Sequence, residues 1–326
     1  MNTIRRSVLF VAVALCAVAA IGAAGVQDDS AMKASTVDPG YPMTVLDDTG
    51  MELTVERKPQ RIVSVTTFTD DILLDLVEVE RIVAVTTFAE DKSISNVADR
   101  VAAVPNKITL NVEIILSLRP DIVFVANWSE ADKVQQLRNA GVEVFLLESG
   151  LTVAHIQEQI ATVAKIVGEE SNGAALIDGM NARLAAVEQK VASIPEAERL
   201  AVLDYAIWGT APGEGTSWAE ILKFAGVKNS VEGFAVNEWG QVPVSREKLL
   251  ELDPDILILP GWVYGDPEGA ANNFKTTAED PALRGMKAVV ENRVYMMPEQ
   301  IKASTSQYLV DAVEWLAAVA YPELFD

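Results

Sequence analysis

The sequence predicts an α/β protein of two Rossmann-like lobes, bridged by a single long rigid helix, with a ligand cleft between the lobes. Three observations support this fold class. Short apolar runs alternate with helical patterns in both halves of the chain, the middle is helical without a strand, and one segment of the first half recurs in the second. The 326 residues are enough to build two cores.

The predicted strands are nearly continuous apolar runs, rich in β-branched residues. This pattern is typical of strands that are buried on both faces of a parallel sheet. Helical patterns, for example 112–118, 129–140 and 247–252, separate several of these runs, as expected for βαβ units. The predicted strands are 61–66, 81–86, 121–126, 143–148, 200–206, 255–260 and 294–298.

The middle of the chain carries two consecutive helical patterns. Apolar residues recur at helical spacing from Val153 to Val167, and Gly168 is expected to end this helix. A second pattern fills 170–194 and ends at Pro195; as one helix it would be about 37 Å long at ~1.5 Å per residue. The predicted divisions are an N-terminal lobe (43–168), an interlobe helix (169–195) and a C-terminal lobe (196–326).

An internal repeat links the two lobes. Residues 113–128 align without gaps with residues 247–262, and in each copy a helix ends at Pro-Asp, an apolar strand follows, and a Trp comes after the strand. Because ligands of open α/β sheets bind beyond the carboxyl ends of strands, Trp128 and Trp262 are expected to face a shared cleft. The alternative is that Leu-x-Pro-Asp-Ile is a common helix-to-strand turn.

Further large aromatic residues follow other predicted strands or lie in polar loops. Such positions are unusual for core residues and typical of a cleft lining, although packing remains the alternative for each residue. Trp315 differs, because it lies in a helical apolar pattern and is expected in the core. The ligand-binding candidates are Phe68, Phe88, Trp128, Trp208, Trp239, Trp262 and Tyr264.

The N-terminus has the pattern of an export signal. Arg5 and Arg6 precede an apolar run that ends in small residues, which predicts a signal peptide over 1–25 and a linker over 26–42. The run is also long enough to act as an uncleaved anchor. Lipid attachment at Cys16 is a third possibility, disfavoured by the bulky Leu15 before it. Each alternative places the remaining chain outside the cytoplasm, in the periplasm or at the cell surface.

Composition argues against several other functions. The formal net charge of −21 disfavours binding to nucleic acid, which needs Lys and Arg for phosphate contacts. Cys16 and His155 are the single residues of their types, so a disulfide, a cysteine-based metal site and a histidine-rich metal site are not expected. No nucleophile elbow is present. We therefore expect a protein that is not an enzyme and carries no resident cofactor. We also expect it to be a monomer.

An ordered set of motifs resembles the helical-backbone periplasmic binding proteins of ABC importers for ferric siderophores, haem and vitamin B12. The match covers about 43–326 in the family's order. The motifs are Thr44-Val-Leu-Asp-Asp-Thr-Gly, Pro59-Gln-Arg-Ile-Val-Ser, Leu116-x-Leu-x-Pro-Asp-Ile-Val, Gly141-Val-Glu-Val, Ile221-Leu-Lys-Phe-Ala-Gly, Val242-Pro-Val-Ser-Arg-Glu-Lys-Leu and Asn292-Arg-Val-Tyr.

The resemblance implies a binding protein that delivers a metal chelate to an ABC permease and its ATPase. Anionic catecholate siderophores would call for cations in the cleft, where Lys133, Lys275 and Lys302 are the candidates and no arginine cluster is present. The segment 126–137 resembles vitamin B12-binding proteins, so a corrinoid is favoured and a ferric siderophore comes second. The alternatives are a receptor for sensing or adhesion and an extracytoplasmic enzyme using the same cleft.

The resemblance also implies one carboxylate on each lobe that contacts permease arginines. The family's Thr-Glu-Ile-Leu motif places Asp71 at the N-lobe position, with Asp in place of Glu, and Glu220 is expected at the C-lobe position. The alternative is that both are ordinary acids in the first turn of a helix, where the helix dipole favours negative charge.

Overall fold

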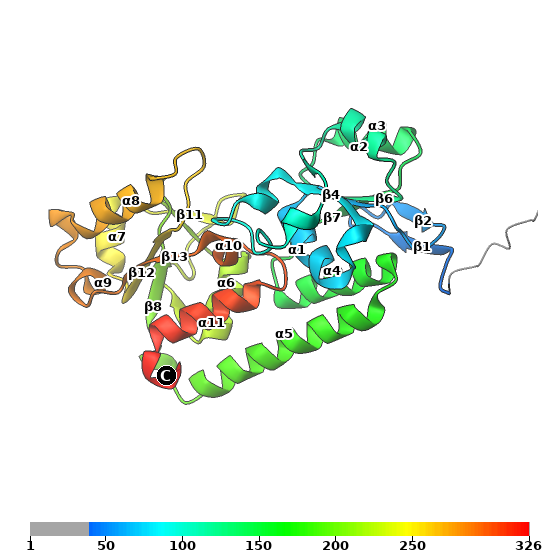
Figure 1. The fold of residues 1–326 in the computed structure, drawn as a ribbon. Coiled ribbons are helices and arrows are strands. Elements are labelled where there is room, and N and C mark those ends of the chain that lie inside the picture. Colours follow the sequence, from blue (N-terminus) through cyan, green and yellow to red (C-terminus); the bar gives the residue numbers. More distant parts are fainter. Residues whose placement is uncertain (1–38, 326) are drawn as a thin grey trace, which may run out of the picture. The chain divides into compact units, whose positions relative to one another are not determined.

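The computed structural model describes residues 39–325 as a mixed α/β fold with two parallel sheets (Figure 1). The predicted signal peptide, Cys16 and most of the predicted linker lie outside these residues. At the end of that linker, Tyr41 is buried and its hydroxyl donates to the Ile166 carbonyl oxygen at 2.8 Å. Tyr41, at the end of the predicted linker, therefore packs against the N-terminal lobe.

The N-terminal lobe contains a five-stranded parallel sheet of order β5-β4-β3-β6-β7, preceded by an antiparallel hairpin, β1-β2. The side chains of β3, β4, β6 and β7 are all buried, which explains their continuous apolar sequences. The strands are β1 (Met43–Leu46), β2 (Glu52–Val55), β3 (Ile62–Ser64), β4 (Ile82–Thr86), β5 (Lys107–Ile108), β6 (Ile122–Ala126) and β7 (Val144–Leu147).

Helices connect these strands and begin at polar caps. The Thr66 side chain accepts a hydrogen bond from the Thr69 backbone N–H and so fixes the start of α1 directly after β3. Gly168 ends α4 in the left-handed conformation, with φ of 70°. The helices of this lobe are α1 (Thr67–Leu76), α2 (Val112–Leu118), α3 (Ala131–Asn139) and α4 (Val153–Val167), with short 3₁₀ turns at Val79–Arg81, Thr87–Glu90 and Val101–Ala103.

The C-terminal lobe contains a four-stranded parallel sheet of order β10-β8-β12-β13 and an antiparallel ribbon, β9-β11. Its strands are β8 (Ala201–Asp204), β9 (Thr210–Pro212), β10 (Lys228–Asn229), β11 (Gln241–Pro243), β12 (Ile256–Pro260) and β13 (Val294–Met297). Its helices are α6 (Ser217–Ala225), α7 (Arg246–Leu252), α8 (Gly269–Ala278), α9 (Lys287–Val290), α10 (Glu299–Lys302), α11 (Leu309–Ala320) and α12 (Pro322–Phe325), with 3₁₀ turns at Glu196–Glu198 and Pro281–Leu283.

Helix α5 (Glu170–Val191) connects the two lobes (Figure 1). It packs against α1 and α4 of the first lobe and against α6, α11 and α12 of the second. Gly173 permits the close crossing with α4, because a Cβ at this position would lie 2.5 Å from the Ala164 Cβ. The single continuous bridging helix that the sequence predicts is therefore present, and it ends three residues before the predicted end at residue 194.

The predicted parallel strands are confirmed, each shorter by a residue or more at one end or both. The hairpin strands, the β9-β11 ribbon and the edge strands β5 and β10 were not predicted. They are two to four residues long, and part of their surface is exposed, so they lack a continuous apolar run. Among the described residues, no helix is long and apolar enough to span a membrane.

Candidate ligand-binding cleft

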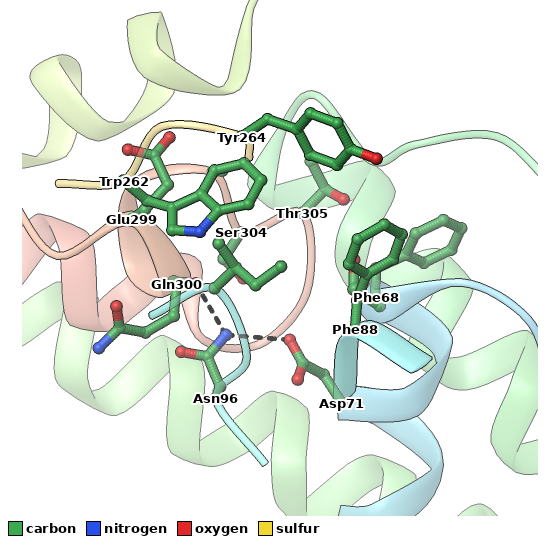
Figure 2. A pocket seen from close by; sticks show the side chains of 13 residues that line it. Phe68, Asp71, Phe88, Asn96, Trp262, Tyr264, Glu299, Gln300, Ser304 and Thr305 are labelled. Atoms are coloured by element: carbon green, nitrogen blue, oxygen red, sulfur yellow. Dashed lines mark hydrogen bonds between the residues drawn. The ribbon is translucent and has the colours of Figure 1, made fainter. Parts of the chain in front are cut away.

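A cavity of about 270 Å³ lies between segments of the two lobes (Figure 2). Phe68 and Phe88 come from the first lobe, where they follow β3 and β4, and Trp262 and Tyr264 come from the loop after β12 in the second. These four aromatic residues are thus brought together from the carboxyl ends of strands in both sheets, as the sequence predicts. Their contact with a ligand stays a prediction.

A wider hollow of about 640 Å³ shares Phe88, Trp262 and Tyr264 with this cavity. It continues along the loop 261–267 and is bordered on the other side by Asp91 and Ser93. The Trp262 and Tyr264 rings meet edge to face with their centroids 5.8 Å apart. The two rings therefore form a wall that the cavity and the hollow have in common.

Phe68 and Trp128 form an aromatic pair with centroids 6.0 Å apart. Phe68 is only 3% exposed and belongs to the core as well as to the cavity lining, whereas Trp128 is 64% exposed and does not line the cavity. The two tryptophans of the repeat are thus placed differently. Trp262 lines the cavity, whereas Trp128 contacts Phe68, which lines it.

Trp208 and Trp239 border a separate hollow of about 470 Å³ within the second lobe. Both side chains are 75% exposed and lie on the loops around the β9-β11 ribbon. The remaining lining includes Asn237, Gln241 and Lys302. The structure therefore does not place these two tryptophans in the interlobe cavity. Trp315, by contrast, packs against the core and meets Tyr295 edge to face, as predicted.

Asp71 lies at the base of the cavity and joins the two lobes. Its carboxylate, from α1, is 4% exposed, and Oδ2 accepts hydrogen bonds from Ser306 Oγ at 2.8 Å and Asn96 Nδ2 at 3.0 Å. Asn96 Nδ2 also donates to the Gln300 carbonyl oxygen at 2.8 Å, so one amide connects both lobes (Figure 2). Burial raises the pKa of Asp71 to about 7.

The neighbouring Asp70 is fully buried below the cavity. Its Oδ2 accepts hydrogen bonds from Thr86 Oγ1 at 2.8 Å and the Thr86 backbone N–H at 3.2 Å. Burial raises the pKa of Asp70 to about 8. These bonds hold α1 against the end of β4.

Three charged side chains separate the cavity from the hollow beside Trp208. Lys302 Nζ lies 3.2 Å from Asp204 Oδ1 and 3.4 Å from Glu299 Oε2, and all three side chains are largely buried. Burial raises the pKa of Glu299, while the two neighbouring carboxylates hold the pKa of Lys302 above its usual value against the opposing effect of burial. The group is thus a charged wall between the two spaces.

None of the three predicted cations lines the cavity. Lys133 pairs with Glu130 on α3 at 2.5 Å, and Lys275 lies on α8. Within residues 39–325, no group of three His, Cys, Asp or Glu residues could hold a metal ion. His155 lies in the first turn of α4, half-buried and distant in sequence from the cavity-lining segments.

The predicted permease-contacting acids do not form an equivalent pair. Asp71 is buried between the lobes, so its carboxylate is not accessible in this conformation, and its contact with a permease stays a prediction. Glu220 lies in the first turn of α6, as expected, but is half-buried. Its carboxylate accepts from the Val153 backbone N–H at 3.3 Å and pairs with Lys223 at 3.4 Å.

The sequence of 62–301 matches the periplasmic binding protein family. The chain belongs to this family. The ABC transporter substrate-binding lipoprotein YvrC of Bacillus subtilis is 25% identical over 98% of this chain and 99% of its own length. The cobalamin-binding protein of Halobacterium salinarum is 25% identical over 67% of this chain and 58% of its own length.

Solved structures show the same fold. The molybdate-binding protein MolA of Haemophilus influenzae superposes with a TM-score of 0.73, over 87% of this chain and 92% of that protein, at 18% identity. At this identity the likeness concerns the fold alone. The two-lobed α/β architecture predicted from the sequence is therefore confirmed for this family member.

Sequence reasoning missed the polar part of the cavity. Asn96, Glu299 and Ser304 line it, the last two in the segment that follows β13. The run Ala-Ser-Thr-Ser at 303–306, which comes soon after a predicted strand, was the available signal. The sequence does not predict that Asn96 lines the cavity, because its loop has no periodic pattern and its position depends on how the loop folds.

Proposed function

We propose that this chain is the extracytoplasmic solute-binding protein of an ABC importer and captures a metal chelate between its lobes. A corrinoid is the favoured ligand, with a ferric siderophore second. The observation that carries the proposal is the cavity walled by aromatic residues from both lobes, Phe68 and Phe88 on one side and Trp262 and Tyr264 on the other. A ligand there contacts both lobes at once and stabilises their closed arrangement.

Size supports a bulky ligand. The cavity of about 270 Å³ and the hollow of about 640 Å³ share aromatic walls, and their volumes are in the range of sites for organic ligands of drug size or larger when both are used together. Flat conjugated chelates offer the π-faces that Trp and Tyr rings pack against. The relatives support the same reading: one is described as an ABC transporter substrate-binding lipoprotein and another as a cobalamin-binding protein.

The partners in this proposal are an ABC permease and ATPase. Because the internal repeat relates the two lobes, we expect the permease to contact equivalent exposed groups on both of them. Glu113 and Glu247 are such a pair: both are exposed acids at the second position of a helix, α2 and α7, after the capping residues Asn111 and Ser245. They are better placed than Asp71 to steer docking on permease cations.

Native mass spectrometry of the purified protein tests the ligand. We expect a co-purifying or added corrinoid, or a ferric siderophore, to bind as one molecule per chain. No adduct with dicyanocobinamide, cyanocobalamin or ferric hydroxamates would contradict the chelate proposal. A sensing or adhesion receptor would use the same cavity, so uptake of the labelled ligand in cells with and without the permease separates the two roles.

A further inference from the structure

The charged groups that line the interlobe cavity are acidic. Asp71 and Glu299 are both part of its lining, one from each lobe, and no Lys or Arg among residues 39–325 lines it. Two cations lie outside the lining: Lys302 behind Glu299, and Arg100, which pairs with Asp75 and also lowers the pKa of Asp71. A ligand that enters this space therefore meets carboxylates and aromatic faces.

The positive charge of Lys302 does not neutralise the negative charge that a ligand meets in the cavity. Its ammonium group is buried and within 3.4 Å of both Asp204 and Glu299, so its charge is taken up by two carboxylates. Counted together, these three groups carry one more negative than positive charge when all are ionised. An anionic ligand would have to displace one carboxylate to reach Nζ.

Asp71 keeps one oxygen available. Both side-chain hydrogen bonds, from Ser306 and Asn96, go to Oδ2, and no described residue donates to Oδ1. Because Asp71 lines the cavity, this oxygen has room for a further partner there. A positive charge or a hydrogen-bond donor on the ligand would supply that partner.

We propose that Asp71 and Glu299 select the charge of the ligand, so that the cavity takes cationic or neutral chelates and rejects anionic ones. This inference rests on the proposed function and restricts the metal chelates that bind to those without a net negative charge. Aromatic faces strengthen the preference, because their negative π-faces attract cations. Tris-catecholate ferric siderophores and free oxyanions are thereby excluded, whereas cationic hydroxamate chelates and uncharged or cationic corrinoids fit.

Calorimetric titration with chelates that differ in charge tests the proposal. Ferrioxamine B is cationic, ferrichrome is neutral and ferric enterobactin is anionic; cyanocobalamin and its monocarboxylic acid form a second pair of nearly equal size. We expect affinity to fall from cationic through neutral to anionic in the first series, and to be lower for the acid in the second. A unit charge at about 10 Å in an effective dielectric of about 20 corresponds to roughly a tenfold step.

Matched variants assign the effect to its residues. Asp71→Asn can retain both bonds, since one carbonyl oxygen can accept from Ser306 and Asn96 as Oδ2 does. We expect Asp71→Asn and Glu299→Gln each to reduce the preference for the cationic chelate about tenfold. Glu158→Gln, an exposed acid on α4, removes the same formal charge away from the cavity and should leave the preference unchanged.

The pH profile gives a readout that a structural role would not change. Asp75 raises the pKa of Asp71 and Arg100 lowers it. Tyr308 donates a hydrogen bond to Asp75, and Glu299 lines the same cavity. Since the pKa of Asp71 is about 7, ferrioxamine B should bind more tightly at pH 8 than at pH 6, and Asp71→Asn should flatten this dependence.

Failure of the charge-selection proposal can be distinguished from failure of the proposed function. Binding of these chelates with no order of charge, or an unchanged order in both cavity variants, overturns the charge-selection proposal and leaves the chelate-binding function intact. Binding of none of the chelates instead overturns the proposed function on which it rests.

Discussion

At the scale of single residues, the aromatic residues of the cleft divide into those that line the cavity and those that pack behind the lining. Trp262 lines both the cavity and the adjoining hollow, while Trp128 packs behind Phe68. We therefore expect Trp262→Ala to weaken chelate binding about tenfold or more, since a stacked aromatic contributes about 0.5–1.5 kcal/mol beyond its burial. Trp128→Ala should have a smaller effect. Calorimetry on both variants decides, and equal losses would contradict this division.

Asp70 predicts how stability depends on pH. Its pKa rises from 3.8 to about 8 on folding, so the folded state favours the protonated form. This contribution to stability is fully present below about pH 4, falls progressively as the pH rises, and is gone above about pH 8. Asp70→Asn, which can still accept from Thr86, should raise the free energy of unfolding by more at pH 8.5 than at pH 6. Urea unfolding at both values checks this; an equal effect at both would contradict the buried-acid reading.

At the scale of elements, the crossing of α4 and α5 depends on a small residue. A Cβ at Gly173 would come within 2.5 Å of the Ala164 Cβ, whereas one at Gly179, also in α5, would meet nothing within 4 Å. Gly173→Ala should therefore destabilise the protein by roughly 1–3 kcal/mol through overpacking. Gly179→Ala should stabilise it by about 0.5–1 kcal/mol through helix propensity. Thermal unfolding of the two variants compares them; two effects of the same sign would contradict the close-packed crossing.

The elements also show which features a sequence can predict. Buried parallel strands such as β6 and β12 are readable because both faces are apolar, and α4 and α5 are readable from their period and from Gly168. The ribbon strands β9 and β11 are not, because three residues with one exposed face leave no pattern. Placement at strand ends predicted the aromatic side of the cavity, but the burial of Asp71 depends on contacts with a segment more than 230 residues later.

At the scale of the whole molecule, α5 restricts how far the lobes can separate. It packs on helices of both lobes, and the Asp71, Asn96 and Gln307 hydrogen bonds join the lobes at the cavity base. Many binding proteins close by large hinge motions. Here we expect little change in radius of gyration when a ligand binds. Small-angle scattering with and without ligand measures this, and a large compaction would contradict it.

The docking proposal also concerns both lobes together. Glu113→Ala with Glu247→Ala should abolish or strongly reduce uptake in cells while leaving chelate affinity in solution unchanged, because both acids lie outside the lining of the cavity. The double variant of Glu158 and Glu188, exposed acids on α4 and α5, is the charge-matched control. Normal uptake by the Glu113 and Glu247 variant would contradict the docking assignment.

Hydrogen–deuterium exchange with and without dicyanocobinamide or ferrioxamine B tests the central claim most directly, because it locates the ligand on the intact protein. We predict that bound ligand protects backbone amides in both 67–96 and 261–305, the segments that enclose the interlobe cavity. Protection confined to the loops around Trp208 and Trp239, or no protection with either chelate, would contradict capture of a chelate between the lobes.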